Sequence, residues 1–510
     1  MIRSTSVGLL AAAGLAVAWP TVGAAQAQDA APAPAAPGSD APVATAPPAE
    51  VVAPVTTVAP PAPVTASSLR APDLFSASAG RTGLPDTLWD GASADLARAV
   101  MPMAGKPMSP AATAFARRLY ATGAHAPDGA AADADLAAAR LAAVLALGDA
   151  AGTEAMLAHT PGVAASPALS QIAAEADLVL GHEDQACLVG DALTQGKDQP
   201  YFRRLRAYCL VRANSMDAAQ LSFDLAGSQA RDEVYQRLMS AALGAAAPGA
   251  ADLRDGLNYA LSKHLKLDLT PALTGAWRPI LVAIAADPAA DPALKASAQG
   301  LLQPPAVAAP PAVAAPVLTP LAAGDLKSAR AARAQIARDD AAGATALELA
   351  LIDAALTAAE GKPDAAVMDQ LVERGGAGDP GERLRAQQAA ALYGALDVGM
   401  SGPARAEFAA FDLGRSPASQ ARLFELQLVQ APGDMALLAL WLAADAGVAG
   451  PPPVERAQIV RALMRAGFKD DARAFAVEGL VGLITPPPAP PPPKAATAKA
   501  RAPAPRRRKR

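Results

Sequence analysis

The sequence predicts an all-α protein, and three observations support this prediction. Alanine, a strong helix former with little area to bury, supplies much of the hydrophobic fraction of 52%, whereas aromatic residues account for only 4%. Apolar residues recur at helical spacing, for example at Leu141, Val144 and Leu145 before a break at Gly148. We find no convincing run of alternating β-branched residues of the kind that forms a sheet. We therefore expect closely packed helices rather than a bulky aromatic core.

Residues 1–27 have the composition of a signal peptide. Arg3 supplies a positive charge, residues 7–18 are apolar, and residues 25–27 (Ala-Gln-Ala) match the small-x-small rule for cleavage after Ala27. The apolar run of about a dozen residues is shorter than the roughly 20 that span a membrane. No cysteine follows this run, which argues against a lipoprotein. We expect a periplasmic or secreted mature protein, with an uncleaved anchor as the alternative.

Segments rich in proline and alanine divide the rest of the chain. Residues 28–70 contain almost no large side chains and cannot bury enough surface to offset chain entropy, so we expect a disordered tether. Residues 301–320 repeat this composition and predict an interdomain linker, and residues 485–510 form a proline-rich, disordered basic tail. Two helical blocks remain, residues 71–300 and 321–484.

Charge is unevenly distributed along the chain. The last 17 residues hold eight of the 44 lysines and arginines and the leader holds one, while all 48 acidic residues lie between them, so the body has a net charge of −13 and the tail +8. After a signal peptide, such a tail suits anionic envelope polymers or lipid head groups better than nucleic acid. The alternatives are a contact between tail and body, or a solvated tail that only aids solubility. Its basic residues are Lys494, Lys499, Arg501, Arg506, Arg507, Arg508, Lys509 and Arg510.

A weak internal repeat runs through both helical blocks. Gly148, Gly181 and Asn214 stand 33 residues apart, and each ends an apolar helical stretch. Glycine and asparagine can take the left-handed conformation that terminates a helix. A small residue early in the next helix, such as Ala186 or Ala219, then lets two backbones approach. In the second block, the glycines at a spacing of 34 are Gly399, Gly433 and Gly467.

This spacing resembles the tetratricopeptide (TPR) family of helical hairpins. The best unit runs from about Gln199 to Arg231, where Ala207 matches the small residue of the first helix and Asn214 the turn. The early Trp and Leu of the family and its closing Pro are mostly missing. The resemblance implies stacked hairpins of the TPR or α-solenoid type in two blocks, and irregular helix packing is the alternative. Further matches to its small–aromatic–small pattern are Ala219, Phe223 and Ala226, with Ala404 and Phe408 in the second block.

Two cysteines, Cys187 and Cys209, are the candidates for a disulfide bond. An exported protein enters an oxidising compartment, where two thiols commonly pair. The helical interpretation places them in consecutive helices, so antiparallel packing can bring them together. Two buried free cysteines are the alternative, and a redox site is disfavoured because the Cys-x-x-Cys spacing is absent.

No motif predicts a metal, a cofactor or a catalytic residue. Of the histidines, His182 stands beside two acids at 183–184, which we interpret as an exposed helix start rather than a metal site, because adjacent helical residues point apart. Residues 376–381 match a dinucleotide fingerprint formally, but no strand precedes them and we expect a loop. We expect packing roles for Trp89, Trp277 and Trp441. The other three histidines, His125, His159 and His264, are scattered.

These features together favour an exported helical-repeat scaffold that binds protein partners in the cell envelope, with the basic tail contacting anionic components. The alternatives are an enzyme, or an accessory subunit of one, that acts on envelope polymers through carboxylates without a sequence signature, and a structural spacer. The sequence does not identify the partner, and no cofactor is expected.

Overall fold

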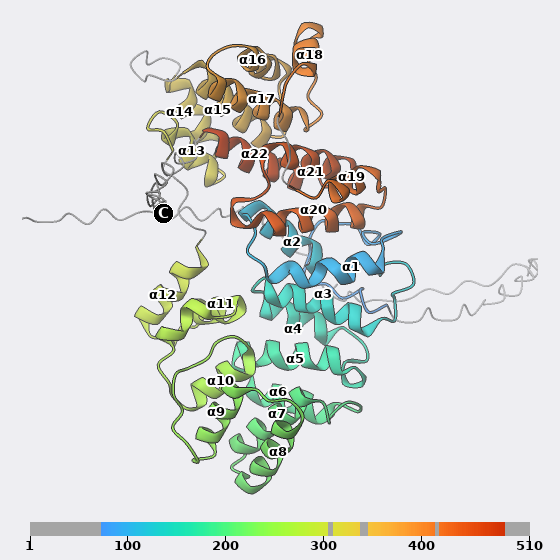
Figure 1. Ribbon diagram of the computed structural model, residues 1–510, viewed down its shortest axis with the longest axis vertical. Coiled ribbons are helices and arrows are strands. Elements are labelled where there is room, and N and C mark those ends of the chain that lie inside the picture. Colours follow the sequence, from blue (N-terminus) through green and yellow to red (C-terminus); the bar gives the residue numbers. More distant parts are fainter. Residues whose placement is uncertain (1–72, 304–309, 337–344, 414–417, 485–510) are drawn as a thin grey trace, which may run out of the picture. The chain divides into compact units, whose positions relative to one another are not determined.

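The computed structural model describes residues 73–303, 310–336, 345–413 and 418–484 and is shown in Figure 1. The predicted signal peptide, tether and basic tail lie outside these residues, as does part of the predicted linker. The described residues form helices, short 3-10 helices and connecting turns, and no strand occurs among them. The predicted all-α fold class is therefore confirmed.

The helices of the N-terminal part are α1 Ala94–Val100, η1 Met101–Gly105, α2 Pro110–Ala121, α3 Ala134–Ala146, α4 Ala150–Ala158, η2 Val163–Ala165, α5 Pro167–Leu180, α6 Glu183–Ala192, α7 Pro200–Arg212 and α8 Met216–Gln229. The next helices are α9 Glu233–Ala242, α10 Gly256–His264, η3 Thr270–Gly275, α11 Arg278–Ala286, α12 Pro292–Leu302, α13 Ala315–Ala322 and α14 Leu326–Ile336. The C-terminal part contains α15 Ala346–Ala359, α16 Ala365–Gly376, α17 Pro380–Gly394, α18 Gly402–Ala409, α19 Gln420–Leu428, α20 Pro432–Ala446, η5 Gly447–Ala449, α21 Pro453–Arg465 and α22 Lys469–Ile484.

The helices begin at residues that satisfy their free backbone amides. Asp149 caps α4 by accepting from the Gly152 amide at 2.8 Å. Thr345 and Glu348 form a reciprocal capping box at the start of α15, with bonds of 3.1 and 2.8 Å. Such caps contribute about 1 kcal/mol each, so polar residues placed in the turns set where each helix starts.

The predicted helix ends of the N-terminal part adopt the left-handed conformation. Gly148, Gly181 and Asn214 have φ values of 95°, 79° and 58° and follow α3, α5 and α7. Gly467 likewise follows α21 with φ 85°. The 33-residue spacing therefore reflects a recurring turn that reverses the chain between packed helices.

Gly433 has a different role from the other glycines of the repeat. It lies in the first turn of α20, where an added Cβ would come within 2.8 Å of Trp89 Cε3 and 3.0 Å of the Leu88 carbonyl oxygen. Its lack of a side chain thus permits close packing rather than a turn. Near Gly399, the left-handed residue is Asp397, with φ 62°.

One hydrophobic core contains residues from both predicted helical blocks. It includes Phe115 of α2, Leu437 of α20 and Phe475 of α22, all fully buried. The Ala111 amide of α2 donates to Glu478 Oε2 of α22 at 2.7 Å, and Arg118 pairs with Asp471. In the described residues, the N-terminal helices α1 and α2 therefore pack on α20 and α22, as Figure 1 shows.

Two smaller cores gather residues between 145 and 302. One gathers the inner faces of α7, α9 and α10, and the other gathers residues of α10, α11 and α12. Part of the segment predicted as a linker is helical, since Val317, Leu318 and Leu321 of α13 recur at helical spacing and are buried. In the described part of the chain, one helix, Pro432–Ala449, is apolar and long enough to span a bilayer, and α20 within it is largely buried in the core.

Candidate metal centre

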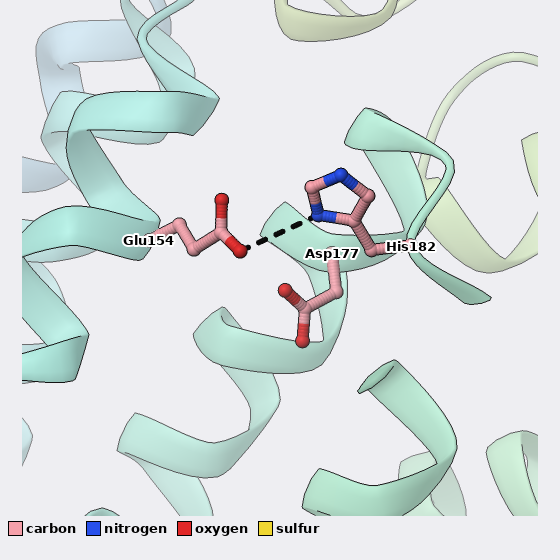
Figure 2. A group of neighbouring side chains, drawn as sticks. All are labelled: Glu154, Asp177 and His182. Atoms are coloured by element: carbon pink, nitrogen blue, oxygen red, sulfur yellow. Dashed lines mark ion pairs between the residues drawn. The ribbon is translucent and has the colours of Figure 1, made fainter. Parts of the chain in front are cut away.

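Three side chains from successive helices converge beside the turn between α5 and α6. They are Glu154 of α4, Asp177 in the last turn of α5 and His182, the N-cap of α6. One ligand atom from each lies within 4.8 Å of the others. Figure 2 shows the carboxylates of Glu154 and Asp177 and the imidazole of His182 turned toward a common space.

The termination of α5 sets the positions of two of these groups. Gly181 ends the helix in the left-handed conformation, so the chain turns back and the His182 amide donates to the Asp177 carbonyl oxygen at 2.8 Å. This bond holds the backbone of His182 directly above Asp177. Glu154 projects from α4, which packs against α5. The site therefore depends on a local cap and on one helix–helix contact.

Asp177 is buried among these residues, with only 4% of its surface exposed. Burial, and to a smaller extent the negative charge of Glu154, raise the pKa of its carboxyl to about 7, while the charge of His182 opposes this shift. His182 Nδ1 lies 3.3 Å from Glu154 Oε1, and both of these side chains are about half exposed. The site thus combines one buried and one accessible carboxylate with an accessible imidazole, a donor set suited to a proton or a cation.

The sequence prediction considered His182 only beside its neighbours Glu183 and Asp184 and favoured an exposed helix start over a metal site there. Glu183 pairs with Lys263 Nζ at 3.4 Å, and Asp184 accepts from Arg212 at 2.7 Å, so both acids face other helices. The prediction that adjacent residues point apart is confirmed. Glu154 and Asp177 were missed because only the packing of α4 on α5 brings them to the histidine. The sequence signal that could have identified them is the predicted pairing of consecutive helices, which places one turn of α4 beside the end of α5.

The other histidines have separate surroundings. His125 Nδ1 lies 3.5 Å from Asp90 Oδ1. The His264 ring lies edge-on to Tyr208 with centroids 6.3 Å apart, and His159 is the C-cap of α4. None of the three takes part in a group of three or more potential metal ligands within the described ranges.

Cys187 of α6 and Cys209 of α7 form the predicted pair. Their Sγ atoms are 1.97 Å apart and their Cα atoms 5.7 Å apart, which is disulfide geometry. The prediction that antiparallel consecutive helices bring the two cysteines together is confirmed. The disulfide fastens α6 to the α7–α8 hairpin, which directly follows the candidate metal centre in the chain.

The remaining sequence candidates lie in loops or in packing positions. Trp89 is fully buried, Trp277 is the N-cap of α11, and Trp441 of α20 lies under the Arg422 guanidinium with 4.2 Å to its ring centroid. Of the segment 376–381, expected to be a loop, only residues 377–379 form a turn between α16 and α17, whereas Gly376 ends α16 and residues 380–381 begin α17. A cavity of about 480 Å³ adjoins this loop and is lined by Gly375, Gly376, Pro380, Arg383, Leu384, Gln387, Glu407, Ala410, Phe411 and Asp412.

The basic residues from Lys494 to Arg510, the predicted contact with anionic components, lie outside the described residues. Comparison of the chain with protein-family models, with curated proteins and with solved structures finds no match.

Proposed function

We propose that the protein is an exported helical-repeat scaffold of the TPR type that binds a protein partner in the cell envelope. The observation that carries the proposal is an uncovered apolar stripe on α8. Leu221 and Leu225 stand one turn apart on the outer face of this helix and are 63% and 45% exposed. Large apolar side chains that recur on one uncovered helix face are typical of a docking surface.

The chemistry of the stripe indicates what kind of partner fits. Asp217 and Asp224 are exposed and lie along one edge of the stripe by helical spacing. Gln220 donates to Asp224 at 2.9 Å on the same edge. The matching partner is an amphipathic helix whose apolar face meets the two leucines and whose basic residues meet the two aspartates.

The hairpin beneath the stripe is well suited to present it rigidly. The inner faces of α7 and α8 meet at small residues, with Ala207, Ala219 and Ala226 all buried at the interface. Close backbone approach of this kind leaves little room for the helices to shift. The disulfide from α6 adds a covalent tie to α7. A rigid surface binds with less ordering cost than a mobile one.

The test is site-specific photocrosslinking in the intact cell envelope. A photoreactive residue at position 221 is compared with one at position 301, because Leu301 of α12 is also exposed and apolar but lies outside the stripe. We expect one protein to be crosslinked from position 221 and not from position 301. Crosslinks that are the same from both positions, or none from position 221, would contradict the docking surface.

The basic tail is assigned to anionic envelope components on its charge of +8. Deleting residues 494–510 should remove envelope association at low salt, since each basic residue contributes about 1 kcal/mol near an anionic membrane and salt screens the attraction. The full chain washed at high salt is the matched comparison. Association of the deletion variant that equals that of the full chain at low salt would remove the tail from the proposal.

A further inference from the structure

Glu154, Asp177 and His182 carry the donor set of a divalent transition-metal ion. Zn²⁺ binds imidazole nitrogen and carboxylate oxygen, and three protein ligands leave a coordination position for water. The three side chains lie on α4, at the end of α5 and at the start of α6. We propose that they bind one Zn²⁺ ion, which ties α4 to the α5–α6 turn. This inference stands independently of the docking surface on α8.

The state of Asp177 is the observation that points to a ligand. The residue is 96% buried, one oxygen of its carboxylate is directed toward Glu154 in Figure 2, and no residue that the structure describes donates a hydrogen bond to that carboxylate. A buried carboxylate without donors is costly, and proteins satisfy such groups by pairing or by metal coordination. The accessible neighbours at this site are a second carboxylate and an imidazole, which are themselves metal ligands.

A second buried acid on the same helix provides the contrast. Glu175 is also more than nine-tenths buried, but it accepts from the Tyr201 hydroxyl at 2.8 Å and from the Gly256 amide at 2.6 Å. The fold therefore supplies donors to one buried carboxylate of α5 and not to the other. Asp177 differs from Glu175 in facing potential metal ligands instead of donors.

The geometry can close around an ion with little movement. A tetrahedral ion about 2.1 Å from each ligand holds the ligand atoms about 3.4 Å apart, which is shorter than the present limit of 4.8 Å. The cap of α5 fixes the backbones of Asp177 and His182, and the half-exposed side chains of Glu154 and His182 can rotate toward Asp177. The nearby cations do not compete for Asp177, because Lys263 pairs with Glu183 and Arg212 with Asp184.

The experiment measures Zn²⁺ binding to the purified full chain by competition with a chromophoric chelator. Asp177→Asn and His182→Asn each remove one ligand. His125→Asn is the matched control, because His125 is similarly exposed and also faces a carboxylate, Asp90, but belongs to no group of three ligands in the described residues. We expect one Zn²⁺ per chain, at least tenfold weaker binding by both site variants and unchanged binding by the control.

A site variant could bind Zn²⁺ poorly because it is misfolded, so the effect of Zn²⁺ on stability is measured as well. Zn²⁺ should raise the Tm of the unaltered chain and slow amide exchange in residues 177–183, and both effects should be lost in Glu154→Gln, which changes a half-exposed side chain by one atom. A chain that binds no Zn²⁺ overturns the assignment. So does binding that survives unchanged in Asp177→Asn and Glu154→Gln, because the ion would then lie elsewhere.

Discussion

Arg140 of α3 should be among the most important single side chains for the stability of the N-terminal region. It is fully buried, and its guanidinium donates to the carbonyl oxygens of Tyr120, Phe75, Ala77 and Thr122. Burial lowers its pKa to about 9. The side chain therefore connects the segment before α1 to the end of α2, and the substitution to examine is Arg140→Met, which keeps the bulk and removes the donors.

The size of the effect follows from the carbonyl groups that would lose a donor. The Phe75 oxygen keeps a bond from the Ala124 amide at 3.1 Å, whereas the other three carbonyls lose the guanidinium. Each buried acceptor without a partner costs about 1–3 kcal/mol, and relief of the arginine's own desolvation offsets part of this cost. We expect Arg140→Met to lower the free energy of local opening by about 3–5 kcal/mol, the range typical of breaking a buried charged network.

Amide hydrogen exchange measures this local opening directly. The Ala79 amide donates to the Ala121 carbonyl oxygen, and the Ala124 amide to that of Phe75, so both report the attachment of the segment. A loss of 3 kcal/mol speeds their exchange by roughly a hundredfold. Arg98→Met is the control, because this arginine pairs with Asp133 at the surface and should leave exchange unchanged. Equal exchange in the two variants would refute the reasoning.

Three further predictions concern other parts of the fold. Gly433→Ala should destabilise the chain by about 1–3 kcal/mol in urea unfolding because its Cβ meets Trp89, whereas Gly482→Ala, with open space around it, should not; equal midpoints would exclude the close contact. Burial raises the pKa of Asp471 to about 6 from 3.8, so stability should fall by about 3 kcal/mol as pH rises from about 3 to 7, most steeply between the two pKa values, and Asp471→Asn should lack this part of the pH profile. Cys209→Ser should lower stability by about 3 kcal/mol under oxidising conditions only, and a difference that persists in reductant would contradict the disulfide explanation.

Local turn chemistry explains why much of the fold could be predicted from the sequence. Gly148, Gly181 and Asn214 end helices in the left-handed conformation that their residue types favour, and their spacing predicted the hairpins. The pairing of Cys187 with Cys209 followed from the same step, because consecutive antiparallel helices bring such residues together. Each of these features depends on residues close in the sequence.

Features that depend on long-range packing were not predicted. The bond from the Ala111 amide to Glu478 joins residues 367 positions apart, and no local pattern marks either partner. Gly433 matched the spacing of the turn glycines, yet its small size serves the contact with Trp89. In the sequence, Asp177 of the candidate metal centre is one acidic residue within a predicted helix, and nothing distinguishes it from the other acids. Only the packing of α4 and the turn to α6 reveals that its carboxylate lacks a donor.

The proposed ion and the disulfide would each link two neighbouring helices within the run from α4 to α8. The ion would fix α4 to the α5–α6 turn through His182, and the disulfide fixes α6 to α7, on which α8 presents its stripe. The two ties act on different helix contacts, so each would stiffen a different part of the run from α4 to α8. If the stripe binds its partner as a preformed surface, removing either tie should weaken binding even though neither touches the partner. A scaffold that tolerates the loss of both ties would instead bind through α7 and α8 alone.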